Sequence, residues 1–82
     1  MDKSLSLTIV SPDGLIFEGK ADKVRLPGVQ GSFVVLPMHA PLISQLSSGS
    51  VYYTVDGEDK SIVIKSGFVE VKQEIVSICV ER

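Results

Sequence analysis

The chain has 82 residues, of which 44% are hydrophobic and 22% charged, and its formal net charge is −2. A domain of this size buries about 60% of the surface of its unfolded chain, so it can fold alone with little stability to spare. The eight Lys and Arg residues stand singly and form no basic cluster, so we expect no nucleic-acid partner.

Membrane and export signals are absent from the sequence. No apolar run is long enough to cross a bilayer, and Met1-Asp2-Lys3 is not followed by a signal-like apolar segment. We therefore expect a soluble, intracellular protein. Cys79 is the only cysteine, which excludes an internal disulfide and agrees with a reducing compartment.

The predicted elements begin with a hairpin. Apolar and polar residues alternate over Leu5–Val10, which is the pattern of a β-strand with one buried face. Ser11-Pro12-Asp13-Gly14 follows as a turn, and Leu15–Glu18 is predicted to return as the second strand.

The C-terminal half repeats this pattern in short segments rich in β-branched residues. The predicted strands lie in Val51–Val55, Ser61–Lys65, Phe68–Val71 and Ile75–Val80. The turn formers between them are Asp56-Gly57-Glu58-Asp59, Ser66-Gly67 and Lys72-Gln73-Glu74.

These strands decide the fold class. No helical face persists for three turns, and the best helical candidate, Pro41–Leu46, is too short to be more than a turn. Roughly eight or nine short strands cannot bury a face as one flat layer, so they must form a sandwich or a barrel. We predict one all-β domain over residues 1–82, an antiparallel β-sandwich of two sheets or a flattened barrel of about eight to ten short strands.

Gly28-Val29-Gln30-Gly31 has the spacing of a GXXG nucleic-acid clamp. That clamp needs flanking helices and basic residues, whereas strands flank this segment in an acidic protein. It also lacks the Lys-Ser/Thr ending of a P-loop. We predict a flexible turn in which both glycines have positive φ, at a loop end of the kind that carries contacts.

His39 is the only histidine, between Pro37 and Pro41. A zinc site would need Cys79 and acidic residues as further ligands, in no familiar spacing. Two other interpretations stay open: His39 supports its loop by donating to a backbone carbonyl, which we favour, or it contacts a partner directly.

The remaining candidates offer no active site. Cys79 lies in a nearly continuous apolar strand, Ile75–Val80, and we predict that it packs in the core. The carboxylates of the Asp56–Asp59 turn need only solvent, and Glu70 is predicted to face solvent or a lysine on a neighbouring strand. The sequence therefore predicts no catalytic residue, no metal and no cofactor, and a protein that is not an enzyme.

Three stretches, in order and with compatible spacing, carry a resemblance that covers essentially the whole chain. They are LTIVSPDG (Leu7–Gly14), LPGVQGSFVVLPMHAPLI (Leu26–Ile43) and SGFVEV (Ser66–Val71). Together they resemble the epsilon subunit family of the F-type rotary ATP synthase, called delta in mitochondria. The P-x-H-A-P-L core at Pro37–Leu42 is the most specific part of the match.

The resemblance implies a β-sandwich of two sheets at the foot of the central stalk. Such a subunit is non-catalytic: it binds the gamma subunit and the loops of the c-ring, and it helps to couple proton transport to ATP synthesis. It lies on the cytoplasmic face of the bacterial inner membrane and associates with the membrane only through the complex.

Carried over by position, the resemblance implies two contact surfaces. The c-ring surface is expected at Val29, Gln30, Gly31, Ser32 and His39. The gamma surface is expected at Leu42, Ile43 and Ser44, with neighbours in Ser47–Gly49. For Leu42 and Ile43, packing in the core is an equal alternative.

The chain departs from the family pattern in two respects. The family usually continues into a C-terminal helical hairpin, whereas this sequence stops at Arg82, so we do not expect inhibition or ATP binding through a hairpin. In addition, Ser32 replaces an acidic residue, and Val34 and Met38 replace glycines. The contact with the ring is therefore expected to be less charged than in relatives.

Two other classes of function remain as alternatives. A free-standing β-sandwich that binds a carbohydrate or peptide would need an aromatic platform, and five aromatic residues without tryptophan make a poor one. A metal-dependent enzyme built on His39 has too few ligands.

Overall fold

The computed structural model describes residues 3–82, and this range forms nine β-strands. They are β1 (Leu5–Ser11), β2 (Gly14–Ala21), β3 (Lys23–Gly28), β4 (Gly31–Val35), β5 (Leu42–Leu46), β6 (Gly49–Val55), β7 (Glu58–Ile64), β8 (Ser66–Lys72) and β9 (Ile75–Glu81). Met1 and Asp2, where the sequence predicts no signal segment, lie outside the described residues. None of the described residues belongs to a helix that could cross a membrane.

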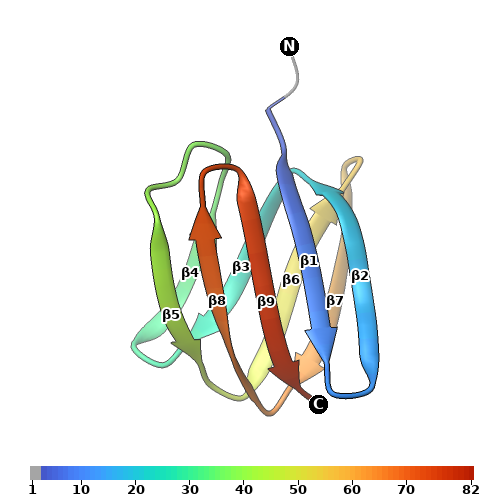
Figure 1. Ribbon diagram of the computed structural model, residues 1–82, viewed down its shortest axis with the longest axis vertical. Helices are drawn as coiled ribbons and strands as arrows, with labels where there is room; N and C mark the ends of the chain where they lie inside the picture. The colour runs from blue at the N-terminus through green and yellow to red at the C-terminus, as the bar shows by residue number, and fades with distance from the viewer. Residues whose placement is uncertain (1–2) are drawn as a thin grey trace.

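The strands form two layers that face each other. In Figure 1, β5, β8, β9, β1 and β2 make the front layer, and β4, β3, β6 and β7 lie behind it. Hydrogen bonds connect them in the order β2-β1-β9-β8-β5-β3-β6-β7, with β4 beside β3. The layers join where Gly28 of β3 pairs with Leu46 of β5. The predicted all-β fold of two layers is confirmed, and the parallel pair β1–β9 departs from the antiparallel pattern.

One hydrophobic core lies between the layers, because each strand turns alternate residues inward. From the front layer the buried core residues include Leu5, Leu7, Ile9, Leu46, Val69, Val71, Val76, Ile78 and Val80, and from the rear layer Val24, Leu26, Val35, Val51, Tyr53 and Ile64. Phe17 of β2 packs on Tyr53 of β6 with ring centroids 4.8 Å apart, so an aromatic pair bridges the two layers.

The predicted hairpin turns are found with adjusted bounds. Ser11–Gly14 connects β1 to β2 as expected. The turn between β6 and β7 is tighter than predicted, because Asp56 and Gly57 both have positive φ (52° and 78°) and β7 already begins at Glu58. Two central residues with positive φ match the right-handed twist of the flanking strands, which favours a short hairpin loop.

The prediction that Cys79 packs in the core is wrong, because its thiol is exposed. Val76, Ile78 and Val80 take the inward positions of β9, so the period of two places Cys79 outside with Ser77. The apolar character of Ile75–Val80 suggested burial on both faces, whereas only one face of this strand is covered.

Candidate interaction surface

A row of apolar side chains crosses the outer face of the front layer. Phe68 of β8 lies opposite Cys79 of β9, Cys79 lies beside Val10 of β1, and Val10 lies opposite Leu15 of β2. Residues directly opposite each other on neighbouring strands share a face, so these four side chains form one line across four strands. We call Phe68, Cys79, Val10 and Leu15 the apolar row.

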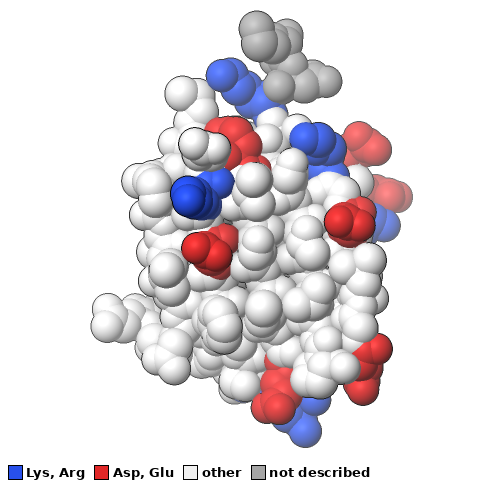
Figure 2. Space-filling view, in the orientation of Figure 1, with Lys and Arg blue, Asp and Glu red and all other residues white. Residues whose placement is uncertain are grey.

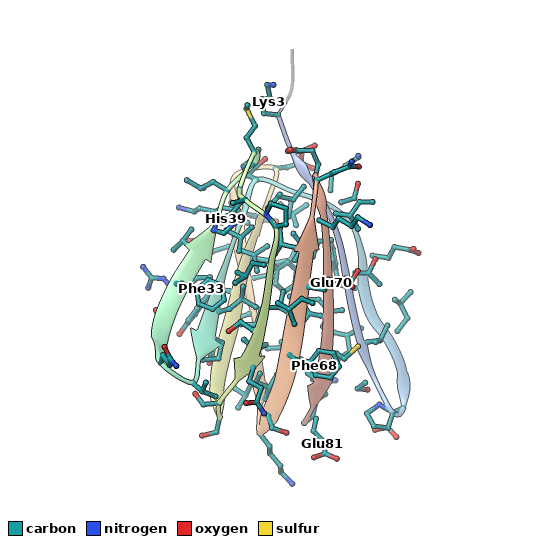
Figure 3. All side chains as sticks on the ribbon, turned by 60° about the vertical axis from the view of Figure 1, so that its left-hand side comes forward. Lys3, Phe33, His39, Phe68, Glu70 and Glu81 are labelled. Carbon is teal, nitrogen blue, oxygen red and sulfur yellow. The ribbon has the colours of Figure 1, made fainter. Side chains whose placement is uncertain are left out.

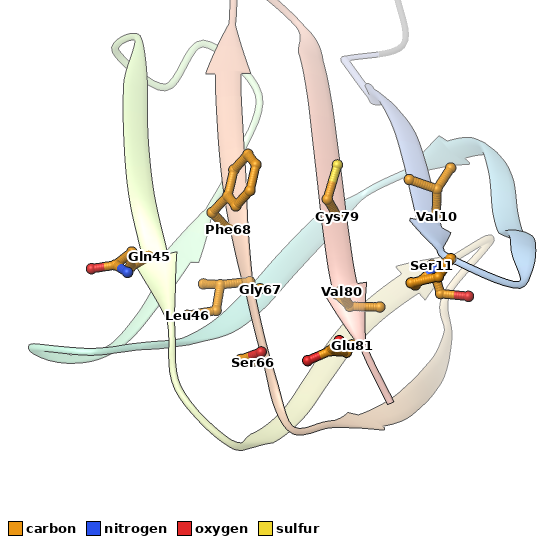
Figure 4. Close-up of a pocket in the computed structure, with 11 residues that line it drawn as sticks. Val10, Ser11, Gln45, Leu46, Ser66, Gly67, Phe68, Cys79, Val80 and Glu81 are labelled. Atoms are coloured by element: carbon orange, nitrogen blue, oxygen red, sulfur yellow. The ribbon is translucent and has the colours of Figure 1, made fainter.

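The apolar row is open to solvent. Leu15 is 60% exposed and Phe68 53%, although neither residue carries a polar group that would benefit from water. A shallow hollow of about 530 Å³ lies along the row, and Figure 4 shows Phe68, Cys79 and Val10 side by side at its lining. Figure 2 shows this face with a broad area free of Lys, Arg, Asp and Glu below its charged upper part. Exposed apolar patches of this kind mark interaction sites.

A β-bulge brings Leu15 into the apolar row. The register of β1 and β2 shifts between Ile9, which lies opposite Phe17, and Val10, which lies opposite Leu15. Ile16 is the extra residue, and both Ile16 and Phe17 pack against the core. Without the shift, Ile16 would oppose Val10, so the bulge decides which side chain is presented outside.

Gly67 keeps β8 and β9 close beneath the row. A Cβ added there would collide with the Cys79 carbonyl oxygen and would lie 3.1 Å from Val80 Cα. Both atoms belong to the backbone and cannot move without separating the two strands. Glycine is therefore required by close approach, and its φ is not in the left-handed region.

The residues expected at the c-ring do not lie together. Val29–Ser32 form the tip of the hairpin of β3 and β4, at the lower left in Figure 1. His39 lies beyond the other end of β4, toward the end of the molecule where Lys3 lies (Figure 3). The five residues of β4 separate the two places by about 13 Å or more.

The hairpin tip is uncharged and is fastened to the front layer. The Val29 amide donates to the Gln45 carbonyl at 3.2 Å, and the Ser47 amide donates to the Pro27 carbonyl at 2.8 Å. Because of these bonds, Val29–Ser32 lie beside Ile43–Gln45 around a shared hollow.

The glycines of the hairpin tip have different roles, which corrects the prediction that both have positive φ. Gly31 has φ +125°, as predicted. Gly28 does not have positive φ and is required by space, because an added Cβ would lie 2.7 Å from the Gly31 carbonyl oxygen.

The hydrogen bond to a backbone carbonyl that the sequence predicted for His39 is present. Its Nδ1 lies 2.7 Å from the Ala40 carbonyl oxygen, and since that oxygen can only accept, Nδ1 carries the hydrogen and donates. The His39 amide also donates to the Leu36 carbonyl at 3.1 Å. No group of three or more His, Cys, Asp or Glu among residues 3–82 is arranged to hold a metal ion.

Glu74 is a contributor to this loop that the sequence did not reveal. Its two carboxylate oxygens accept the Met38 amide at 3.0 and 3.1 Å, across 36 positions of the chain. Met38 has φ 71°, a left-handed conformation that a side chain with a Cβ adopts at a cost. The carboxylate therefore holds a strained residue in place. No local pattern links the two positions.

The residues expected at gamma divide between the two sides of β5. Ile43 is 74% exposed on the outer face, whereas Leu42 and Ser44 point inward and are half-buried. Leu42 packs against the core, and the Ser44 hydroxyl donates to the Gln45 carbonyl at 3.2 Å. Of the two alternatives for these residues, a core role fits Leu42 and a surface role fits Ile43.

Comparison with known proteins agrees with the resemblance seen in the sequence. A family described as "ATP synthase, Delta/Epsilon chain, beta-sandwich domain" matches residues 4–82. The ATP synthase epsilon chain of Nitratidesulfovibrio vulgaris is 42% identical over 81 residues, which are 99% of this chain and 60% of the relative. That of Koribacter versatilis is 40% identical, over 99% of this chain and 57% of the relative. The chain thus spans about three fifths of the length of these curated relatives.

Two solved structures share the fold. A chain of the Euglena gracilis mitochondrial ATP synthase, OSCP/F1/c-ring, superimposes with a TM-score of 0.91 and 22% identity over 100% of this chain and 53% of that one. A chain of the Tetrahymena thermophila mitochondrial ATP synthase, central stalk/c-ring, superimposes with a TM-score of 0.83 and 15% identity over 99% of this chain and 65% of that one. At these identities the likeness establishes the fold alone.

Proposed function

Since this chain belongs to the delta/epsilon chain family of ATP synthase through its beta-sandwich domain, we propose that it is a non-catalytic subunit of the central stalk. In this role it binds the gamma subunit and the c-ring and helps to couple proton transport to ATP synthesis. Residues 1–82 act as one domain, peripheral to the cytoplasmic face of a bacterial membrane and attached to it only through the complex.

The main observation in support of this proposal is the exposed apolar row, which we propose as the docking site for gamma. A small domain that exposes Phe68 and Leu15 on one uncharged area has a surface that a partner is expected to cover. A few side chains at the centre of an interface, often aromatic ones, contribute most of its binding energy once water is excluded, and Phe68 is the aromatic residue of the row. Ile43 extends this surface to its edge at β5, beside the hollow that Pro41 and Leu42 also line.

The hairpin tip, Val29–Ser32, is the proposed contact with the c-ring. It is exposed, carries no charge and lies beside Ile43–Gln45, so the two proposed surfaces are continuous around one edge of the sandwich. His39 lies apart from this tip, and its bond to Ala40 supports a structural role in its own loop. An uncharged tip implies a contact with the ring that depends little on salt.

The test is purification of the membrane ATPase from the source cell, followed by identification of its subunits. We expect this chain to be recovered with gamma and the c-ring. Its absence from a complex that retains gamma would contradict the proposal, and a free pool bound to a carbohydrate or peptide would favour the ligand-binding alternative.

A matched pair of variants tests the docking surface itself. Phe68→Asp places a charge in the apolar row and is expected to weaken binding to a gamma-containing F1 complex by about a hundredfold or more. Tyr52→Asp is the control, because Tyr52 is exposed to a similar degree (47%) on the rear layer. Equal effects of the two substitutions on binding would place the docking site elsewhere.

A further inference from the structure

Two strands of the front layer carry the same charged pair at the same level. β2 presents Glu18 and Lys20 outward, and β8 presents Glu70 and Lys72 outward, each as Glu-x-Lys. All four side chains are exposed. The two pairs are 50 positions apart or more in sequence, so the correspondence arises only in the folded sheet.

The register of the sheet aligns the pairs into two rows. Glu18 lies opposite Thr8, Thr8 beside Ser77, and Ser77 opposite Glu70, so the carboxylates occupy the two ends of one row. The next row joins Lys20 to Lys72 in the same way. It runs from Lys20 through Ser6 and Ile75 to Lys72.

These rows are parallel to the apolar row and ordered beside it. Along β8 the outward residues are Phe68, Glu70 and Lys72, so the apolar row is followed by the carboxylate row and then by the ammonium row. Each row is about 7 Å from the next, since two residues along a strand span that distance. Within a row, the two charges lie about 14 Å apart across three strand spacings. Figure 3 shows Phe68 and Glu70 in this order along β8.

We propose that these two charge rows set the orientation in which the gamma subunit docks on the apolar row. This inference rests on the proposed function. The partner surface has an apolar ridge that covers the row, cationic groups next to the ridge and anionic groups beyond them. Apolar contacts alone would allow the partner to dock on the apolar row in either of two orientations related by a 180° turn. In the turned orientation, the cationic and anionic groups of the partner would lie away from the carboxylate and ammonium rows.

The position of the four charged side chains allows them to orient a partner with little loss of binding affinity. They lie at the border of the apolar area, where exposed groups are only partly desolvated on binding, and such groups act on association rate and register more than on the strength of the contact. The Lys20 ammonium already donates to the Ser6 hydroxyl at 3.1 Å, which holds it over the face of the sheet.

The test exchanges the charges within each pair, because an exchange leaves the net charge unchanged. The variants are E18K/K20E, E70K/K72E and the combination of both. The control is K23D/D59K, since Lys23 of β3 and Asp59 of β7 both lie opposite Thr54 on the outer face of the rear layer and both are exposed. Association and dissociation with a gamma-containing F1 complex prepared without this chain are measured at about 0.05 M and about 0.5 M salt.

We expect each exchange on the front layer to slow association at low salt by about tenfold and the combination by more, with a smaller effect at high salt. The control exchange is expected to leave both rates within about twofold of the parent chain. Melting curves confirm that each variant is folded, and if E70K/K72E is unfolded, E18K/K20E on the edge strand β2 decides alone.

Two results would overturn the inference. Front-layer exchanges that bind like the parent chain at low salt would show that the rows are only solvated charges. An equal loss in the control would show that the effect is not specific to this face. If the parent chain itself does not bind the gamma-containing complex, the proposed function fails, and this outcome is distinct from both.

Discussion

The two layers of this sandwich share one core but present different outer faces. The front face carries the apolar row, with Phe68 and Leu15 more than half exposed. Between Arg25 of β3 and Asp59 of β7, the rear face lines a hollow with mainly polar side chains. There the Thr54 hydroxyl donates to the Asp59 carboxylate at 2.7 Å, so polar groups on this face bond to each other.

The difference shows that the alternation of inward and outward residues along a strand does not by itself decide how polar the outer face of a layer is. In both layers, alternate residues of a strand point inward and form the apolar core, and the residues between them point outward. On the rear layer these outward positions mostly hold groups that water or a neighbour satisfies. On the front layer three apolar residues and a thiol occupy one aligned row, which is the arrangement of a surface that another molecule covers.

The largest effect is expected from a comparison of the two sides of β9. Ile78→Ala leaves a cavity in the core and should lower the free energy of unfolding by about 2–5 kcal/mol. Cys79→Ser should change it by less than about 0.5 kcal/mol, since the side chain is exposed. Denaturant unfolding measures both, and the thiol should react with a disulfide reagent in the folded protein. A protected thiol would contradict an outward Cys79.

The next effect concerns the glycine beneath the apolar row. Gly67→Ala forces a Cβ against the backbone of β9 and should cost about 1–3 kcal/mol, as overpacking does. Gly19→Ala is the matched control, because its added Cβ would meet only side-chain atoms, those of the Phe17 ring at 3.2 Å, and no backbone atom of a neighbouring strand. Thermal melting should separate the two variants, and equal melting temperatures would argue against a tight approach of β8 and β9.

A smaller effect is expected at the end loop between β4 and β5. Glu74→Ala removes the acceptor of the Met38 amide and should cost about 0.5–1.5 kcal/mol. Met38→Gly relieves the left-handed φ of 71° and should stabilise the domain by up to about 1 kcal/mol. In the Met38→Gly background, Glu74→Ala should cost more, because a strained Met38 regains energy by relaxing once the carboxylate is gone, whereas glycine at this position has no strain to release. Strict additivity in this double-mutant cycle would mean that Glu74 does not restrain Met38.

The smallest effect on stability comes from the most exposed aliphatic residue of each layer. Ile43→Lys and Val63→Lys, at positions 74% and 71% exposed, should each change the free energy of unfolding by less than about 0.5 kcal/mol. Binding to gamma should separate them, because only Ile43 lies at the border of the proposed docking surface. A large loss of stability for Ile43→Lys would revive the core role that the sequence left open for this residue.

The fold class could be predicted from the sequence because strands and turns are specified by residues close together in the chain. The alternation in Leu5–Val10 and the turn at Ser11–Gly14 each depend on residues close in the chain, and the structure places β1, the turn and β2 there. The failure at Cys79 has the opposite cause. Whether a strand is covered on one face or on both depends on what packs over each face of the sheet, and Ile75–Val80 carries little information about that packing.

The candidate site could not be predicted in this way, because its residues are far apart in the chain. The apolar row unites positions 10, 15, 68 and 79, and its continuity depends on the parallel pairing of β1 with β9 and on the bulge in β2. The bond between Glu74 and Met38 likewise joins distant positions. The separation of His39 from Val29–Ser32 follows from the direction of β4, which carries the chain from one end of the sandwich to the other.

The sequence by itself determined that this protein is an all-β domain of the delta/epsilon chain family, and it predicted the bond of His39 to a backbone carbonyl. These features follow from periodicity, turn chemistry and short motifs, which act within a few residues. Only the tertiary structure decided which outward residues share a row. Register, strand order and a bulge set those positions, and they result from the packing of the whole sheet around one core.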